Sequence, residues 1–396
     1  MYHSRGKFNV ICGEELCRFK GENGPQSPAI LYTRKTNDPL SIDNFRLIGG
    51  ADPSFNNWRD IGDRLLQVIT HLAAGWNANY GHVPFIAIGS KHGNPCGAAL
   101  GDNREEAVHN MVVGDARAIF GGSVITNFEI DGQLAQAMID ATQSQKAIFD
   151  VVIAPGFTAD ALEALARKKG KCRLMVNPAL AEAGAALLDT ASRLVYVRGG
   201  YMIQPNYTFI LNFNHPDMKV FGERNALIES DLLLAWAIGC TSNSNKITIT
   251  RNFQLLGNGT GRQDRVGAAE LAIKIAIDAG HATNVDMYGV ATEAVRRIME
   301  SARKGGRRHN YAAIAKNAVD EALFASIYNL LKGAVAYSSS FFPFEDGPKA
   351  LIDAGIKAIF STSGSVNDAK VQRLCEENGV MLYQLPDTMA RGFFGH

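Results

Sequence analysis

The sequence predicts an α/β fold made of two similar halves. Short apolar runs rich in β-branched residues alternate with longer stretches in which apolar residues recur at helical spacing. Residues 151–177 and 357–384 also share one plan: a strand, a glycine-containing turn, a helix and a second strand. This alternation is interrupted near residues 197–217. We therefore expect one half over residues 1–200 and the other over residues 201–396.

The apolar runs predict buried strands, and the stretches with helical spacing predict the helices between them. The expected strands cover residues 83–88, 151–154, 173–176, 194–197, 358–360 and 380–383. The expected helices cover residues 60–74, 158–169, 262–279, 292–304, 311–331 and 367–378. Thr158 and Asn367 are expected to be N-caps, because the acidic Asp160 and Asp368 follow in the first turn of each helix.

Composition limits the classes of function that the chain can serve. It has 396 residues, a formal net charge of +1 and no basic block, so charge indicates neither nucleic acid nor membrane as a partner. The N-terminus leads into no apolar run of signal-peptide length, and no stretch approaches the roughly 18 apolar residues of a spanning helix. Six widely scattered cysteines favour reduced thiols over disulfides or a paired zinc site. We therefore expect a cytoplasmic protein without a metal centre.

Lys91-His92 is the strongest chemical signal in the sequence. The pair follows the apolar run at residues 83–89 and precedes Gly93-Asn94-Pro95, so it is expected at the end of a strand. Open α/β folds bind their ligands at such strand ends. Histidine is the side chain whose ordinary pKa lies near neutrality, which suits it to proton transfer. The alternative is that the pair is a solvated surface feature of a turn.

Further segments follow Lys91-His92 in a fixed order. They are Asp115–Gly122, Asp150–Gly156, Ser242-Asn243, Gly257–Arg265 and Phe341–Gly347. The ordered series resembles the AICAR transformylase family, which are folate-dependent formyltransferases of purine biosynthesis. The resemblance extends from about Phe19 to His396.

The resemblance implies a fold, a reaction and an assembly. The implied fold is a pair of cytidine-deaminase-like three-layer α/β/α units. The implied reaction moves a formyl group from 10-formyltetrahydrofolate to the 5-amino group of AICAR, giving FAICAR in de novo IMP biosynthesis. The implied assembly is a homodimer with composite active sites, in which the Lys-His strand of one subunit faces Asn and Phe residues of the other. Most members carry an inosinate cyclohydrolase domain ahead of this one, for which the chain has no room, so a freestanding transformylase is expected.

Formyl transfer requires groups that match Lys91, His92 and Asn243. The acceptor amine lies on an electron-poor ring and must lose a proton as it attacks, which needs a base such as His92. Lys91 can supply positive charge and a proton, and Asn243 can bind the formyl oxygen or align the amine. Without the resemblance, an Asn within Thr241–Ser244 would be interpreted as a turn or helix cap.

The folate end is expected in two segments. Gly257–Gly261 precedes an expected helix and can bring backbone N–H groups close to a ligand, although on its own it would be a tight turn. The resemblance places it beside the folate site and assigns folate contacts to Arg265, Pro343, Phe344 and Asp346. For Phe341, Phe342 and Phe344, composition alone predicts that at least two rings lie in the core.

The nucleotide end departs from the family pattern. The family carries Arg-Tyr-Gly-x-Asn-Pro-x-Gln, and direct alignment puts Phe19 and Lys20 at the Arg and Tyr positions, whereas a shift by one residue puts Arg18 and Phe19 there. Lys20 could act there as a point charge, but it lacks the guanidinium fork. The implied substrate-binding residues are Lys20, Asn57, Gly121, Asp150, Phe341, Arg391, Phe394 and His396.

Three functions are consistent with the sequence: a transformylase, a related formyl or acyl transferase with a different amine acceptor, and a non-catalytic nucleotide or folate binder. The transformylase requires Lys91, His92 and Asn243 to meet in one pocket, and the binder predicts that they do not. Small molecules are the expected partners, together with a second copy of the chain. No tightly bound cofactor is expected, since 10-formyltetrahydrofolate is a co-substrate, and a structural monovalent cation is left open.

Overall fold

The computed structural model describes residues 14–142, 146–184, 187–281 and 331–394. The strands are β1 Glu14–Phe19, β2 Ala29–Thr33, β3 Arg46–Gly49, β4 Phe85–Lys91, β5 Asn94–Gly101, β6 Gly122–Thr126, β7 Phe149–Ala154, β8 Arg173–Val176, β9 Ser192–Val197, β10 Gly200–Pro205, β11 Lys219–Phe221, β12 Ile247–Arg251, β13 Gln254–Gly259, β14 Val335–Ser338, β15 Ala358–Ser363 and β16 Met381–Pro386.

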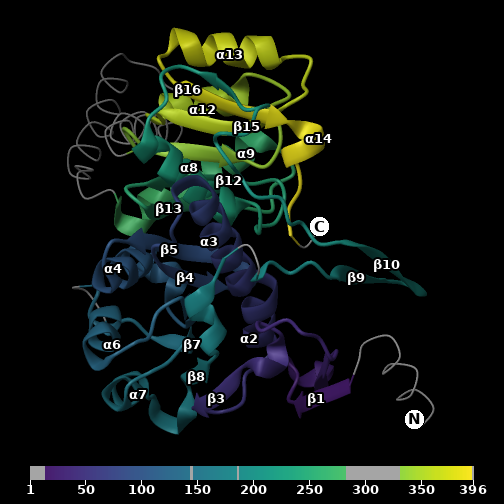
Figure 1. Ribbon diagram of the computed structural model, residues 1–396, viewed down its shortest axis with the longest axis vertical. Helices are drawn as coiled ribbons and strands as arrows, with labels where there is room; N and C mark the ends of the chain where they lie inside the picture. Colours follow the sequence, from purple (N-terminus) through teal and green to yellow (C-terminus); the bar gives the residue numbers. More distant parts are fainter. Residues whose placement is uncertain (1–13, 143–145, 185–186, 282–330, 395–396) are drawn as a thin grey trace, which may run out of the picture.

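Helices cover both faces of the central sheet, as Figure 1 shows. They are α2 Phe55–Asp60, α3 Leu66–Tyr80, α4 Arg104–Gly114, α5 Ala116–Ile119, α6 Gly132–Ile139, α7 Ala159–Leu165, α8 Ala226–Gly239, α9 Arg265–Ala276, α12 Asp346–Asp353, α13 Asp368–Glu377 and α14 Asp387–Ala390. The π-helical segments η3 Ile61–Leu65 and η7 Ile277–His281 extend two of them. The mixed α/β class predicted from the sequence is confirmed.

The central sheet has twelve strands, and its order repeats outward from the middle. From β5 the order is β4, β6, β7, β8 and β3, and from β13 it is β12, β14, β15, β16 and β11. The parallel and antiparallel pairings match step by step in the two halves. The predicted repeat therefore exists as β7-α7-β8 and β15-α13-β16, and the halves join where β5 pairs with β13.

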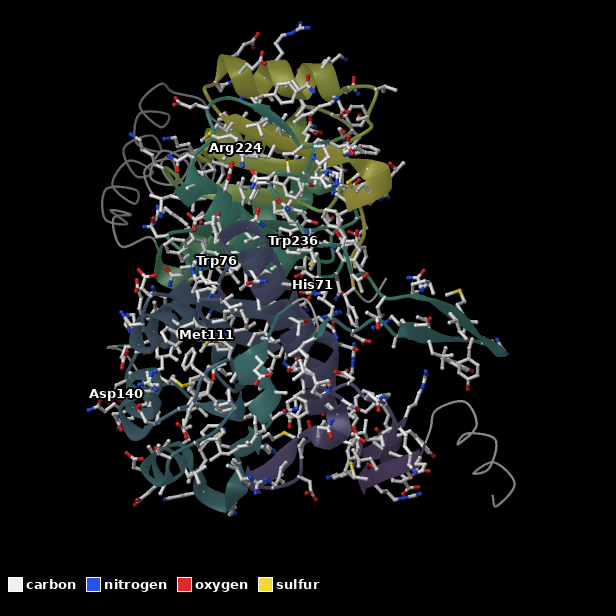
Figure 2. All side chains as sticks on the ribbon, in the orientation of Figure 1. His71, Trp76, Met111, Asp140, Arg224 and Trp236 are labelled. Atoms are coloured by element: carbon white, nitrogen blue, oxygen red, sulfur yellow. The ribbon has the colours of Figure 1, made fainter. Side chains whose placement is uncertain are left out.

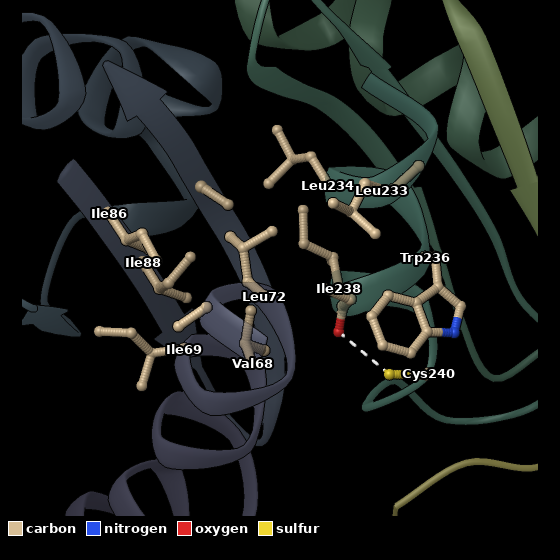
Figure 3. Close-up of a cluster of buried hydrophobic side chains, with 14 of the residues drawn as sticks. Val68, Ile69, Leu72, Ile86, Ile88, Leu233, Leu234, Trp236, Ile238 and Cys240 are labelled. Carbon is tan, nitrogen blue, oxygen red and sulfur yellow. Dashed lines mark hydrogen bonds between the residues drawn. The ribbon is translucent and has the colours of Figure 1, made fainter. Parts of the chain in front are cut away.

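One face of the sheet is covered by α3 and α8, which pack against each other and bury residues from both halves. Figure 3 shows Leu72 of α3 facing Ile238 of α8 in this cluster. Both helices are apolar on nearly every side, which is typical of helices buried between other elements. Gly75 lets them approach closely, because a Cβ there would lie 3.0 Å from a methyl of Leu233. Each fully buried Leu or Ile contributes about 1.5–3 kcal/mol, so this shared core fixes the halves together.

Aromatic side chains lie where the two halves meet. Figure 2 shows His71, Trp76 and Trp236 near the middle of the molecule. The rings of His71 and Trp236 are 6.0 Å apart, edge to face. His71 is fully buried, and its ring nitrogens contact the carbonyls of Gln67 and Tyr207 at 2.7 and 3.0 Å. This histidine is therefore part of the core and is not a candidate acid or base.

The opposite face has two separate cores, one under α4, α6 and α7 and one under α9, α12 and α13. Glycines on the central strands allow helix backbone to touch the sheet. A Cβ at Gly97 of β5 would lie 2.4 Å from the carbonyl oxygen of Met111 in α4. A Cβ at Gly257 of β13 would lie 2.1 Å from the carbonyl oxygen of Ala272 in α9. The same packing device thus occurs in both halves.

The hairpin β9–β10 extends away from the body, as Figure 1 shows, and we call it the arm (Ser192–Pro205). The sequence predicted a buried strand at residues 194–197, and that prediction is wrong about burial. Tyr196 is 69% exposed and Ile203 is 67% exposed. An apolar run indicates that a surface will be covered, but not by which element. The predicted boundary at residues 200/201 falls within the arm.

Most predicted elements are present with shifted ends. The helix expected over residues 60–74 is a longer one, formed by α2, η3 and α3 in succession. Thr158 and Asn367 occupy the predicted N-cap positions, although neither side chain caps its helix by a hydrogen bond. The helix expected over residues 292–304, and all but the last residue of the helix expected over residues 311–331, lie outside the described residues. Within the described ranges, no helix is long and apolar enough to cross a membrane.

Candidate active site

Lys91-His92 lies in a two-residue hairpin turn between β4 and β5, and we call Lys91–Asn94 the Lys-His turn. His92 and Gly93 have φ values of 54° and 75°, and positive φ at both central residues is the mark of the tight hairpin turns that match strand twist. For a histidine this conformation costs about 1–2 kcal/mol. His92 is exposed, so its imidazole is accessible to solvent and is not part of the core.

A buried carboxylate holds the Lys-His turn from below. The N–H of Gly93 donates to Asp60 Oδ1 at 2.7 Å, and the hydroxyls of Ser90 and Ser123 donate to the same carboxylate at 3.3 and 3.4 Å. Burial raises the pKa of the Asp60 carboxyl, while the hydrogen bond from Gly93 and those from the serines oppose the rise. Asp60 ends α2, whose start is fixed by a capping box between Ser54 and Asn57.

Arg64 joins the Lys-His turn to Asn243. Its Nε donates to the carbonyl of Gly93 at 2.5 Å, and its Nη2 donates to Asn243 Oδ1 at 3.0 Å. The Asn243 amide also donates to Asn94 Oδ1 at 3.4 Å, an oxygen that accepts the hydroxyl of Thr260 at 3.3 Å. Burial lowers the pKa of the Arg64 guanidinium. The Asn243 side chain therefore lies beside the Lys-His turn within one chain, joined to it through Arg64 and Asn94.

The Lys91 side chain turns toward a second group of predicted residues. Its Nζ donates to the carbonyl of Phe120 at 2.5 Å, next to Gly121, which has φ of 72°. A Cβ at Gly121 would lie 3.9 Å from Asp150 Oδ1, so Gly121 and Asp150 are close. Asp150 accepts a hydrogen bond from Arg167 at 2.8 Å. Lys91, Gly121 and Asp150 thus lie together, on the side of the turn away from Asn243.

A cavity of about 270 Å³ lies along the Lys-His turn. Its lining includes Lys91, His92, Asn94, Cys96 and Thr260. Burial raises the pKa of the Cys96 thiol, so this cysteine lines the cavity as an uncharged thiol and is not a nucleophile. A cation, an imidazole and polar amide groups around a small cavity can bind a polar ring and move a proton. No cluster suited to a metal ion occurs among the described side chains.

A model of the AICARFT/IMPCHase bienzyme family matches residues 10–275. The chain belongs to this family. Curated relatives described as bifunctional purine biosynthesis protein PurH include that of Anoxybacillus flavithermus, 29% identical over 364 residues, which cover 91% of this chain and 56% of the relative. That of Aquifex aeolicus is 28% identical over 379 residues, covering 95% and 60%. The chain thus spans little more than half the length of these relatives.

The glycine-rich segment of this family member differs from its prediction. Gly257 and Gly259 lie inside β13 and not in a loop, and a Cβ at Gly259 would lie 2.1 Å from the carbonyl oxygen of Ala268 in α9. These glycines therefore make room for a helix and not for a ligand. Asn258 between them ties the halves together, donating to the carbonyl of Pro95 at 3.0 Å. The helix begins at Arg265, not at residue 262, after the N-cap Asp264.

The predicted folate residues gather near the ends of β14 and β15. Arg265 donates to the hydroxyl of Ser338 at 3.2 Å, and the carbonyl of Pro343 accepts the Asn367 amide at 2.6 Å. Only one of the three phenylalanines, Phe342, is buried, so the prediction that at least two rings lie in the core is wrong. The other two rings, and the carboxylate that follows them, are free to line a binding surface.

Phe344 is the most accessible of the three phenylalanines, since 63% of its surface is exposed. Phe341 is half-buried, and Asp346 is exposed at the first position of α12, where its carboxylate accepts the N–H of Gly347 at 2.8 Å. Phe342, by contrast, is buried against Gly347 in α12, where an added Cβ would lie 3.0 Å from its ring.

The predicted nucleotide residues are not all in one place. Arg18 is held by Glu15 through two hydrogen bonds of 3.1 and 3.2 Å, and Lys20 is exposed on the segment after β1. Asn57 is buried, and its side chain accepts the N–H of its own helix cap at 2.9 Å. These three lie at the N-terminal end of the first half.

The C-terminal residues lie apart from that group. The Arg391 side chain donates to Asp387 at 3.2 Å, and the N–H of buried Phe394 donates to the carbonyl of Cys240 at 2.8 Å. His396 lies outside the described residues. The C-terminal segment therefore runs beside the element that leads to Asn243.

Sequence reasoning missed Asp60 and Arg64, which hold the Lys-His turn, and it missed Lys246. Lys246 lies three residues after Asn243 and is fully buried. A signal for the first two existed: an acidic and a basic residue four apart on the inner side of a helix otherwise rich in apolar residues. No local pattern indicates that Lys246 is buried.

Proposed function

We propose that the protein is a phosphoribosylaminoimidazolecarboxamide formyltransferase, which moves the formyl group of 10-formyltetrahydrofolate to the 5-amino group of AICAR. One observation carries the proposal. The Lys-His turn, strained at His92, is held by buried Asp60 and Arg64, and the same Arg64 holds Asn243 beside it. An imidazole and an amide that buried groups hold in fixed positions are preorganised for proton transfer and for binding an oxyanion.

The proposed roles follow from what each side chain can do. His92 accepts the proton that the amine loses as it attacks the formyl carbon. Asn243, held by Arg64, donates its amide hydrogens to the developing oxyanion or to the amine. Lys91 supplies positive charge on the opposite side and a proton for the leaving folate nitrogen. The tetrahedral intermediate then collapses, breaking the bond from carbon to the folate nitrogen and leaving formylated product and tetrahydrofolate.

The proposal is tested by incubating the purified protein with 10-formyltetrahydrofolate and AICAR and following tetrahydrofolate release together with formylated product by mass spectrometry. We expect stoichiometric formation of both products. If the folded protein forms neither product after long incubation, the proposal is refuted. Tetrahydrofolate without formylated nucleotide would indicate hydrolysis in place of transfer.

A different amine acceptor is the second candidate, because the Arg18 guanidinium is already engaged by Glu15. Loss of a charge-assisted hydrogen bond to a substrate phosphate costs about 1.5–3 kcal/mol. If Arg18 or Lys20 grips the AICAR phosphate, replacing it with Ala raises the KM for AICAR by about 10- to 100-fold and leaves the KM for folate unchanged. If neither variant changes either KM, phosphate-free aminoimidazoles become the acceptors to test.

The proposal includes a homodimer, and the arm supports it. Large apolar side chains on the arm are exposed, notably Tyr196, Met202 and Ile203, and such surfaces commonly mark interfaces. Sedimentation analysis should find a dimer in the native protein and a shift toward monomer in Ile203→Glu. A monomeric native protein would contradict this part of the proposal.

The family resemblance implies that Asn243 and the Lys-His strand come from different subunits, whereas the hydrogen bond from Arg64 to Asn243 supports a site built within one subunit. A mixture of inactive His92→Gly and Asn243→Ala homodimers should therefore stay inactive after subunit exchange, because no site in the heterodimer is intact. Recovery of activity would show that the partner's Asn243 serves the site. Exchange itself is verified by mass spectrometry of the mixed dimer.

A further inference from the structure

Arg193, on β9 at the root of the arm, connects the arm to the helix that carries Arg64. Its Nη1 lies 3.5 Å from Oδ1 of Asp63 in the π-helical segment η3. A cavity of about 570 Å³ lies at this point, and Gly62, Asp63 and Arg193 are among the residues that line it. Close packing therefore does not fix η3 against the root of the arm here, and the ion pair spans the gap.

The residue that Arg193 contacts on η3 also holds Arg64. The carbonyl of Asp63 accepts a hydrogen bond from Arg64 Nη1 at 2.9 Å. The Nε and Nη2 of the same guanidinium donate to Gly93 and Asn243. A shift of η3 at Asp63 therefore moves the Arg64 guanidinium relative to both groups that it holds.

Arg193 also contacts the segment that leads to Asn243. Its guanidinium carbon lies 5.7 Å from the centroid of the Phe394 ring, which is a cation–π contact. The N–H of Phe394 donates to the carbonyl of Cys240 at 2.8 Å, three residues before Asn243. One side chain thus contacts η3, which carries the donor of the Arg64–Asn243 hydrogen bond, and the C-terminal segment, which is bonded to the backbone near its acceptor.

Stability alone does not account for this placement of Arg193. The side chains of Arg193 and Asp63 are 25% and 32% exposed, and ion pairs that water reaches contribute little to the free energy of unfolding. The Nε of Arg193 is buried and has no acceptor among the described residues, which is a cost to the folded state. The carboxylate of Asp63 also lies 3.8 Å from Arg59 Nε, so it has a second cationic partner.

From these contacts we infer that Arg193 is a positioning residue of the proposed reaction. It clamps η3 against the C-terminal segment and thereby sets the Arg64 guanidinium and the Asn243 amide in their relative positions. The inference rests on the proposed function only for its effect on turnover, because the hydrogen bond itself can be measured without substrates. The arm then has two parts with different tasks: an apolar tip at the surface and a cation at its root that reaches toward the site.

NMR of side-chain amides in protein labelled with ¹⁵N-asparagine tests the inference without any turnover. Asn243→Ala identifies the Asn243 signal by its absence. Arg193→Met should shift that signal, as Arg64→Met should, because either change alters the hydrogen bond to Asn243 Oδ1. Arg198→Met is the matched control, since it makes the same substitution at an exposed residue of the same arm and should leave the signal in place.

Steady-state rates per folded protein supply a readout that a purely structural role would not move. Arg193→Met should lower kcat by about three- to tenfold, as expected from loss of one partly exposed ion pair and one cation–π contact. Both KM values should stay unchanged, because no substrate contact is removed. Asp63→Asn should act likewise, and the double variant should be no slower than the slower single variant. Arg193→Lys, which restores the charge, should recover part of the loss.

An unmoved Asn243 signal in folded Arg193→Met would overturn the inference, and so would a native kcat if the native protein transfers the formyl group. Equal effects of Arg193→Met and Arg198→Met would overturn it as well, because they would assign the effect to the arm as a whole. A shifted signal in a protein that transfers no formyl group refutes only the proposed reaction. Transfer that does not depend on Arg193 refutes only this inference.

Discussion

Two hairpin turns in the middle of the sheet share one frame, meaning their backbone conformation and the buried carboxylate that holds it, but they carry different side chains. The Lys-His turn (Lys91–Asn94) joins β4 to β5, and what we call the Arg-Asn turn (Arg251–Gln254) joins β12 to β13. The two central residues of both turns have φ between 51° and 75°. A buried carboxylate at the sixth position of a helix accepts the N–H of each turn, Asp60 in α2 and Asp231 in α8.

The two turns differ in the side chains that they carry. His92 is exposed beside a cavity, whereas Phe253 of the Arg-Asn turn packs its ring 6.0 Å from that of Trp76. Arg64 follows Asp60 by four residues and reaches out to Asn243, while the residue four after Asp231 is the apolar Ala235. The frame is thus a structural device of both halves, and in the first half it carries ionisable groups, Lys91 and His92, that line a cavity. The Arg-Asn turn is an internal control for the site.

The largest expected contrast is between Lys91→Met and Arg251→Met. Both side chains are half-buried and stand first in their turns. Loss of a positioned proton donor costs about 100- to 10,000-fold, so Lys91→Met should lower turnover by that factor. Arg251→Met should keep turnover within about twofold of the native value, because peripheral charges contribute little. Steady-state rates at saturating substrates decide the matter, and equal losses in both variants would remove the contrast.

The second prediction concerns how the free energy of unfolding depends on pH through Asp231, the buried carboxylate that holds the Arg-Asn turn. Burial raises the pKa of Asp231 to about 6 from 3.8. The folded state then holds this proton more tightly than the unfolded state, so the contribution to stability is complete below about pH 4 and is lost as pH rises through 6. The change amounts to about 3 kcal/mol.

Chemical denaturation of the native protein and Asp231→Asn from pH 4 to pH 7 measures this contribution. The free energy of unfolding of the native protein should fall relative to the variant by that amount across the range. Parallel pH profiles for the two proteins would show that Asp231 has an ordinary pKa in the folded state. Activity at a fixed pH should respond to Asp231→Asn only through the amount of folded protein.

The smallest expected effect tests the link between Arg64 and Asn243. Arg64→Met should lower turnover by about tenfold, because Asn243 loses its anchor at 3.0 Å. Asn243→Ala removes the positioned amide itself. If the two residues act as a unit, the double variant should be no slower than Asn243→Ala alone, which a double-mutant cycle measures. Strictly multiplicative losses would show that Arg64 acts independently, as a structural residue of the turn.

Much of the fold follows from local patterns, and the exceptions have physical causes. The strand-helix-strand repeat at residues 151–177 and 357–384 was recognisable because each element has its own periodicity. The arm was mistaken for a buried strand, because an apolar strand has the same pattern whether its cover is a helix or another molecule. Gly257 and Gly259 were assigned to a loop, because sequence cannot tell a glycine needed by a ligand from one needed by α9.

The site was predictable in its ionisable residues and not in their support. Lys91 and His92 stand at a strand end, which the sequence indicates. Asn243 is joined to their turn by Arg64 and Asn94, which lie far from it in the sequence, and these contacts depend on the packing of the two halves. The burial of Lys246 is likewise set by the C-terminal segment, through Phe393. Such contacts between distant segments leave no local pattern.

The most direct test of the central claim is transfer of a ¹³C-labelled formyl group to AICAR by His92→Gly and Asn252→Gly. Both substitutions place glycine at a position of positive φ, so both relieve strain in equivalent turns and should leave the thermal midpoint unchanged or raised. We predict that Asn252→Gly transfers the label at the native rate and that His92→Gly is slower by at least about 100-fold. Native transfer by His92→Gly would contradict the assignment of catalysis to the Lys-His turn.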